Sequence, residues 1–171
     1  MNGTINITSK LGFGTRIVFT ISHKKALNET KKGSSIDNVI NVNQFLNKRI
    51  LLAEDNEFNA EIAITILKDV GFLVEHVDDG VACVEMLLKK PEGYYDAILM
   101  DIQMPLMNGF EATKAIRKIP NKAKANTIII ALTANDFKED KITALESGMN
   151  GYLTKPIKAE ALIKTLSDLC K

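Results

Sequence analysis

The sequence has no tryptophan, only two cysteines and four prolines, and 6% aromatic residues among its 171 residues. Cys83 and Cys170 lie far apart and match no CxxC or cysteine–histidine spacing, which argues against a disulfide scaffold and against a zinc site. No apolar run approaches the roughly 18 residues that a membrane-spanning helix requires, and the N-terminus lacks a basic segment followed by an apolar one. We therefore expect a soluble, cytoplasmic chain with both thiols buried.

An excess of charge is also absent, because 22 lysines and arginines nearly balance 21 aspartates and glutamates. The net charge of +1 gives no electrostatic reason to expect nucleic acid or a membrane surface as a partner. The charges are unevenly placed: residues 1–47 hold six bases and two acids (+4), and residues 48–171 hold 16 bases and 19 acids (−3). With 46% hydrophobic residues the chain can form one sizeable core. Two parts of different character are expected.

The first 47 residues are typical of a β-hairpin followed by a linker. Apolar residues alternate with polar ones over residues 5–7 and 17–21, on either side of a glycine-containing turn. Residues 23–47 are rich in lysine, glycine and serine, as solvated linkers are, and residues 39–46 are the stretch with enough apolar side chains to dock. A two-stranded hairpin buries too little apolar surface to be stable alone, so it should belong to a larger structure.

Residues 48–171 alternate short apolar runs with helix-spaced apolar residues. The expected strands are residues 50–53, 73–77, 97–100, 127–132 and 151–153. The apolar stripes expected to face the core are Phe58, Ile62, Ile66 and Val70; Val81, Val84 and Leu88; Ala112, Ala115, Ile116 and Ile119; Ile142, Leu145 and Met149; and Leu162, Leu166 and Leu169. Five successive βα units predict a flavodoxin-like three-layer α/β sandwich, with a parallel sheet of strand order 2-1-3-4-5.

Polar side chains follow four of these strands, and the carboxyl ends of parallel strands meet at one edge of a sheet. Glu54 and Asp55 follow the first strand, Asp101 the third, Thr133 the fourth and Lys155 the fifth. Three carboxylates at one point repel, each pair by roughly 4 kcal/mol at 4 Å in a medium of intermediate dielectric constant, unless a cation lies among them. Oxygen ligands without nearby histidine or cysteine favour Mg²⁺.

The same edge could hold a phosphoryl group. The ammonium of Lys155 and the hydroxyl of Thr133, together with Mg²⁺, would neutralise the equatorial oxygens of such a group. Asp101 is the candidate nucleophile, because a carboxylate can accept a phosphoryl group covalently.

Four motifs resemble the receiver domains of two-component signalling, in particular those at the C-terminus of hybrid sensor histidine kinases. The motifs are Ile50-Leu51-Leu52-Ala53-Glu54-Asp55-Asn56, Leu99-Met100-Asp101-Ile102-Gln103-Met104-Pro105-Leu106-Met107-Asn108-Gly109, Ala131-Leu132-Thr133-Ala134-Asn135 and Gly151-Tyr152-Leu153-Thr154-Lys155-Pro156-Ile157. Any one of them would be weak evidence, but four at consistent spacing are strong evidence. The resemblance covers residues 48 to 170 and predicts a receiver domain over residues 48–171.

The resemblance implies a function and a metal site. A phosphohistidine would donate its phosphoryl group to Asp101 in the presence of Mg²⁺. Asp55 would bind the metal directly, Glu54 mostly through water, and Gln103 through its backbone carbonyl, with Asp101 completing the set. The chain itself would have no kinase activity.

The resemblance also implies roles for residues around the phosphoryl group. Thr133 and Lys155 would grip it, and the aromatic ring of Tyr152 would turn inward when the threonine moves toward it. Gln103 and Asn135 would tune how fast water attacks the acyl phosphate.

Partners are implied in the same way. The Lys155–Pro156 peptide bond would be cis, and the loop that carries it would form a partner surface with Asn59, Ile62 and Ala63. That surface would receive a histidine phosphotransfer protein or the dimerisation domain of a histidine kinase.

The N-terminal hairpin has a resemblance of its own. Residues 2–5 and 12–19 are similar to the last hairpin of the ATP-binding domain of histidine kinases. This implies that residues 1–22 are a remnant of that domain, without its nucleotide-binding motifs, and that the parent protein is a histidine kinase, which could be membrane-anchored. Free hairpin edges could also pair with a second copy of the chain.

Three other functions fit parts of the pattern. An aspartate-nucleophile phosphatase of the haloacid dehalogenase type would place an aspartate two residues after Asp101, where Gln103 stands. A flavin-binding flavodoxin would not place Glu54 and Asp55 against the cofactor phosphate. A receiver-like adaptor that is never phosphorylated would retain the fold and use its surface alone.

Overall fold

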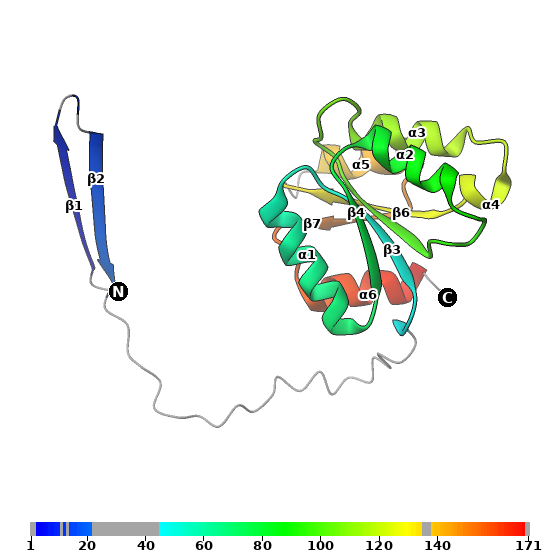
Figure 1. The fold of residues 1–171 in the computed structure, drawn as a ribbon, viewed down its shortest axis with the longest axis horizontal. Coiled ribbons are helices and arrows are strands. Elements are labelled where there is room, and N and C mark those ends of the chain that lie inside the picture. Colours follow the sequence, from blue (N-terminus) through cyan, green and yellow to red (C-terminus); the bar gives the residue numbers. More distant parts are fainter. Residues whose placement is uncertain (1–2, 11, 13, 22–44, 135–137, 170–171) are drawn as a thin grey trace, which may run out of the picture. The chain divides into compact units, whose positions relative to one another are not determined.

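The structure, a computed structural model, describes residues 3–10, 12, 14–21, 45–134 and 138–169. The chain divides into two compact units, residues 1–39 and residues 40–171. Asn135 and Cys170, which the sequence analysis singled out, lie outside the described residues. Figure 1 shows the helices and strands of both units.

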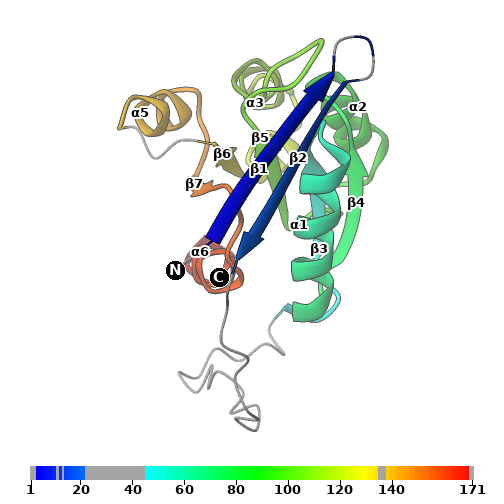
Figure 2. The ribbon, with the colours of Figure 1, turned by 90° about the vertical axis from the view of Figure 1, so that its left-hand side faces the viewer.

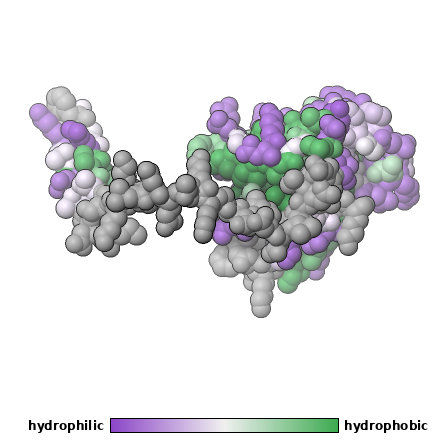
Figure 3. Space-filling view, turned by 90° about the horizontal axis from the view of Figure 1, so that it is seen from below, coloured by the Kyte–Doolittle hydropathy of each residue, from purple (hydrophilic) through white to green (hydrophobic). Residues whose placement is uncertain are grey.

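The first unit contains the predicted β-hairpin. Strands β1 (Gly3–Lys10) and β2 (Gly14–Ile21) pair antiparallel over their full length. One face carries the cross-strand pairs Ile5–Phe19 and Ile7–Ile17, all of them 62% to 70% exposed. The other face is mainly polar, and a space-filling view shows hydrophobic and hydrophilic residues side by side on this unit (Figure 3). The hairpin is therefore amphipathic, and its described apolar face is exposed.

The second unit contains a five-stranded parallel sheet. Its strands are β3 (Arg49–Ala53), β4 (Leu73–Val77), β5 (Ala97–Asp101), β6 (Ile128–Thr133) and β7 (Gly151–Thr154). Their spatial order is β4-β3-β5-β6-β7, which is the predicted order 2-1-3-4-5. Every residue of β5 is buried, as a central strand covered on both faces requires.

Helices cover both faces of this sheet, which makes the three predicted layers (Figure 1). They are α1 (Glu57–Val70), α2 (Gly80–Lys89), α3 (Gly109–Arg117), α4 (Lys122–Ala125), α5 (Lys138–Glu146) and α6 (Ala159–Leu169). One core cluster joins the sheet to α1 and α6, and the other joins it to α2, α3 and α5. A second view shows α1 beside β3 and β4, and α5 at the opposite edge beside β6 and β7 (Figure 2).

The predicted residues Ala112 and Ile116 of α3 and Leu162 and Leu166 of α6 are buried, whereas in α1 and α2 the faces that pack on the sheet differ from the predicted stripes. The buried residues of α1 are Ala60, Ala63, Leu67 and Val70, and those of α2 are Gly80, Cys83 and Leu87. Phe58, predicted to be core, is 70% exposed, and Leu88 is 50% exposed. Ala60 and Ala63 let the backbone of α1 approach the sheet closely, and the larger Leu67 and Val70 are buried on the same helix.

Three further observations refine the prediction. Ile142 and Leu145 of α5 are 55% and 54% exposed, so their assignment to the core is wrong, and Ala144 is buried instead. Met149, the third residue of that stripe, is buried as predicted. The short helix α4 was not predicted. Phe45 is 1% exposed and packs on Phe72 with ring centroids 5.0 Å apart, so the second unit contains core residues before Lys48.

Candidate functional site

A polar cleft lies at the carboxyl edge of the sheet, where the sequence predicts the site. Its lining residues are Glu54, Asp55, Asn56, Asn59, Asp101, Ile102, Gln103, Thr133, Ala134 and Lys155. They come from the ends of β3, β5, β6 and β7 and from the first turn of α1. The parallel register brings these strand ends together, because Ala53 pairs with Met100 and Asp101 pairs with Leu132. All the predicted residues around the phosphoryl group that the structure describes, except Tyr152, line this cleft.

Lys155 bridges two buried carboxylates. Its Nζ lies 2.6 Å from Oε2 of Glu54 and 2.7 Å from Oδ2 of Asp101. Glu54 is 1% exposed and Asp101 is 6% exposed, so water screens neither charge well. The backbone N–H of Lys155 donates to the carbonyl of Thr133, which ties the lysine to the end of β6. The ammonium is thereby held at the centre of the cleft.

The environment of Asp101 raises the pKa of its carboxyl. Burial raises the pKa of the Asp101 carboxyl, and the hydrogen bond and charge of Lys155 offset only part of that rise. The negative charge of Glu54 pushes the pKa in the same direction as burial. An additional cation or hydrogen-bond donor near Asp101 would therefore stabilise the ionised form of its carboxyl.

The loop after β5 closes against the backbone of Asp101. The N–H of Gly109 donates to the carbonyl of Ile102, and a Cβ at residue 109 would overlap the carbonyl oxygen of Asp101. Residue 109 must therefore be glycine for α3 to begin where it does. The backbone N–H of Gln103 donates to Oδ1 of Asp101 over 3.3 Å, so this turn also orients the carboxylate.

Glu54 is held from three sides besides Lys155. Its backbone N–H donates to the carbonyl of Val77, and its own carbonyl accepts from Nε2 of His76 over 2.8 Å. The side-chain amide of Asn59 donates to Oε1 over 3.0 Å. The bond from Asn59 was missed, because the family resemblance placed Asn59 only on a partner surface.

The donor set fits a divalent cation. One carboxylate oxygen from each of Glu54, Asp55 and Asp101 lies within 4.8 Å of the other two. Three negative charges face the single ammonium of Lys155, which leaves an excess of two negative charges. Unlike Glu54 and Asp101, Asp55 is exposed, so its carboxylate is accessible to a metal ion from solvent. Oxygen ligands in this number suit a hard cation such as Mg²⁺.

Thr133 and Tyr152 lie at the fourth and fifth strands that the sequence predicts. Thr133 is 4% exposed at the end of β6, and Tyr152 is 38% exposed on β7. The Lys155–Pro156 peptide bond is cis, as predicted.

The predicted partner surface needs one correction. Ala63 is 1% exposed and packs in the core, so it cannot contact a partner. A narrow apolar notch does run between α1 and the loop after β7, lined by Ile62, Pro156 and Ile157 beside the cleft. Phe58 and Leu106 are 70% and 86% exposed on the segments that follow β3 and β5.

The fold and the acidic cleft together define an α/β protein with an aspartate-centred site at the carboxyl edge of its sheet. Residues 50–167 match the family model of the response regulator receiver domain. The chain therefore belongs to the response regulator receiver family.

Proteins similar to this chain include a much longer histidine kinase. Hybrid signal transduction histidine kinase B of Dictyostelium discoideum is 44% identical over 125 residues, which cover 68% of this chain but only 6% of that protein. This chain thus spans a small part of the relative it matches.

Two solved structures extend the comparison. The receiver domain of sensor histidine kinase PA1611 from Pseudomonas aeruginosa, solved with a magnesium ion in its active-site cleft, is 37% identical, with a TM-score of 0.65 over 72% of this chain and 98% of that one. The Ssk1 receiver domain of Saccharomyces cerevisiae, solved with the histidine phosphotransfer protein Ypd1, is 34% identical, with a TM-score of 0.66 over 74% and 90%. In the part of the chain that the structure describes, no helix is long and apolar enough to cross a membrane.

Proposed function

We propose that Asp101 accepts a phosphoryl group from a phosphohistidine, in a cleft that Mg²⁺ completes. The observation that carries this proposal is the charge of the cleft. Three carboxylates lie within 4.8 Å of one another, Lys155 pairs with two of them, and the pKa of Asp101 is raised. Such a site is stable with a divalent cation and with a dianionic group among its donors. The magnesium-containing cleft of the similar PA1611 receiver supports the choice of metal.

Each residue of the cleft has a separate role in the proposed phosphoryl transfer. An oxygen of Asp101 forms a bond to phosphorus as the bond from phosphorus to the donor histidine nitrogen breaks, and the histidine leaves neutral once it holds a proton on its other nitrogen. Lys155 exchanges one carboxylate contact for the phosphoryl oxygens, and the hydroxyl of Thr133 donates to another oxygen. Bound Mg²⁺ would neutralise charge on the phosphoryl group, held by Asp55, Asp101 and the carbonyl of Gln103, with Glu54 acting through water.

Intact-mass measurement after incubation with acetyl phosphate and Mg²⁺ tests this proposal. We expect the wild type to gain one phosphoryl group, and Asp101→Asn and a chelator-treated sample to gain none. A wild type that binds Mg²⁺ but gains no mass from acetyl phosphate or from phosphorylated Ypd1 would favour the adaptor function and overturn the proposal. The turnover of free phosphate esters would favour the phosphatase.

We also propose that the phosphodonor docks beside the cleft, on Phe58, Ile62, Leu106 and Pro156. Ile62 and Pro156 line an apolar groove together with Glu54 and Lys155 of the cleft. Phe58 and Leu106 are exposed on the segments that follow β3 and β5, and apolar surface near a reactive group favours a protein partner. The similar Ssk1 receiver was solved bound to a histidine phosphotransfer protein, which supports a partner of that kind. Phe58→Ser should slow transfer from phosphorylated Ypd1 but leave labelling by acetyl phosphate unchanged. Equal loss of both would contradict the docking surface.

For the hairpin we propose a role as the terminal part of a kinase ATP-binding domain in a longer protein. The exposed face of Ile5, Ile7, Ile17 and Phe19 is the kind of surface that a preceding domain would cover. A longer protein that includes the preceding domain should protect the hairpin amides from hydrogen exchange, whereas this chain alone should not. Equal exchange in both would contradict this role.

A further inference from the structure

Asn59 has a side-chain contact that its position in α1 does not require. It is the third residue of the helix, and its backbone N–H donates to Oδ1 of the N-cap residue Asn56 over 3.0 Å. That bond completes the ordinary cap. The side-chain amide of Asn59 turns away from the helix and donates to Oε1 of Glu54.

Helix α3 of the same molecule shows the alternative. Its N-cap is also an asparagine, Asn108, and its third residue is Glu111, whose carboxylate accepts from the N–H of Asn108 over 3.1 Å. This reciprocal capping box satisfies two backbone groups. In α1, a glutamate at residue 59 would bring a second carboxylate to Glu54, whereas the amide of Asn59 supplies the donor that Glu54 needs. Asn59 therefore donates to Glu54 in the cleft, and α1 lacks the second hydrogen bond of a capping box.

The bond from Asn59 sets the orientation of a buried carboxylate. Oε1 of Glu54 faces Asn59, and Oε2 faces Lys155 at 2.6 Å. With one donor on each oxygen, rotation of the carboxylate about its last bond would break both contacts. Without Asn59, one oxygen would lose its donor in a site that is 1% exposed, and the plane of the group would no longer be fixed.

We propose that Asn59 is a positioning residue, which holds the carboxylate of Glu54 in the orientation that Mg²⁺ binding and the placement of Lys155 require. The inference rests on the proposed function of the cleft and deepens it. Hydrogen bonds to metal-binding carboxylates commonly contribute about 10-fold or more to metal affinity. The same magnitude is expected here.

Calorimetric titration with Mg²⁺ tests the inference without relying on phosphorylation. Asn59→Leu and Asn59→Ala, which cannot donate, should bind Mg²⁺ about 10-fold more weakly than the wild type. Asn59→Gln retains the donor and should keep most of the affinity. The matched control is Asn121→Ala, which removes a bond from an asparagine amide to Glu92 outside the cleft and should leave Mg²⁺ affinity unchanged. Thermal unfolding in the absence of metal shows which variants are folded.

The outcomes separate this inference from the function on which it rests. Wild-type affinity in either folded non-donor variant would overturn the role of Asn59, and so would loss of affinity in Asn59→Gln equal to that in Asn59→Leu. A wild type that binds Mg²⁺ but cannot be phosphorylated on Asp101 would overturn the proposed function and leave the role of Asn59 intact.

Discussion

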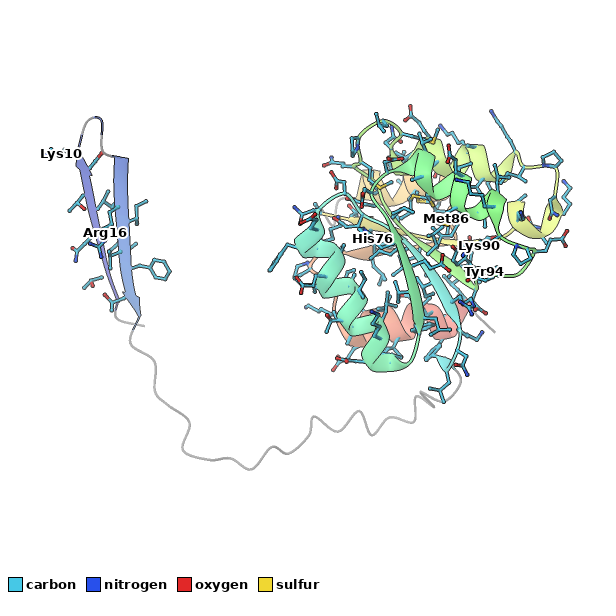
Figure 4. All side chains as sticks on the ribbon, in the orientation of Figure 1. Lys10, Arg16, His76, Met86, Lys90 and Tyr94 are labelled. Carbon is cyan, nitrogen blue, oxygen red and sulfur yellow. The ribbon has the colours of Figure 1, made fainter. Side chains whose placement is uncertain are left out.

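Two clusters of charged side chains in the second unit differ in their balance of carboxylates and hydrogen-bond donors. In the cleft, Lys155 pairs with two of the three clustered carboxylates, those of Glu54 and Asp101, and Asp55 is the third. On β4, the single carboxylate of Glu75 accepts from Lys90 and from the hydroxyls of Tyr94 and Tyr95 over 2.8 to 3.1 Å. The Nζ atom of Lys90 also lies over the ring of Tyr94, and Figure 4 shows the two residues next to each other. The first cluster has too few donors for its charge, and the second has enough.

The pKa shifts differ in the same way. Burial raises the pKa of Asp101, and Lys155 does not compensate fully. Burial would also raise the pKa of Glu75, but the hydrogen bonds from Lys90, Tyr94 and Tyr95 outweigh it and lower the pKa. A cluster whose donors match its charge ties elements together, whereas a cluster with unmatched charge is suited to bind a cation.

The largest effect is expected from Lys155→Met. The substitution leaves two buried carboxylates without their cation, so the free energy of unfolding in the absence of metal should fall by about 3 kcal/mol. Phosphorylation by acetyl phosphate should also slow strongly. Urea unfolding measures the first effect, with Lys89→Met, which breaks an exposed ion pair to Glu85, as the control. Equal stability of the two variants would break the comparison.

Mg²⁺ should stabilise the wild type, since it binds the folded cleft and not the unfolded chain. At about 100 times its dissociation constant, a metal adds about 2.7 kcal/mol to the free energy of unfolding. The gain should persist in Glu75→Gln and shrink in Asp55→Asn. Urea midpoints with and without Mg²⁺ measure it, and an unchanged wild-type midpoint would contradict a metal site.

Glu75→Gln should lower the free energy of unfolding by about 1–2 kcal/mol, because it weakens three hydrogen bonds to an ionised acceptor. The folded-state pKa lies below the ordinary value of 4.5. The contribution of Glu75 is therefore fully present above pH 4.5 and is lost as the pH falls through the folded-state pKa. Urea unfolding over a pH series should show the two proteins converging in acid. A difference that grows on acidification would be the wrong sign.

Lys90→Met should have the smallest effect. Glu75 keeps the two tyrosine hydroxyls when Lys90 is removed, and the Lys90 side chain is partly exposed to solvent. The loss in urea unfolding should therefore be smaller than for Glu75→Gln and much smaller than for Lys155→Met. A loss as large as that of Lys155→Met would mean that the two clusters depend on their lysines alike.

The sequence was sufficient to predict the sheet and the residues of the cleft. The strand order follows from the βα alternation, and the position of polar residues after four apolar runs locates Glu54, Asp55, Asp101 and Lys155 at one edge. These features depend on chain order and on the parallel arrangement of strands, which leave few alternatives.

The packing of the helices could not be predicted as well. The prediction chose the face of the helix with the largest apolar side chains, so it assigned Phe58 to the core. The buried face instead includes Ala60 and Ala63. The contact from Asn59 to Glu54 was also missed, because it depends on where a side chain turns at the first turn of α1 and not on spacing.

The most direct test of the central claim is a calorimetric Mg²⁺ titration of the wild type, Asp55→Asn and Glu75→Gln. Surplus negative charge in the cleft predicts one Mg²⁺ bound per chain, with affinity strongly reduced in Asp55→Asn and unchanged in Glu75→Gln. No binding by the wild type, or equal affinity in the wild type and Asp55→Asn, would contradict the claim.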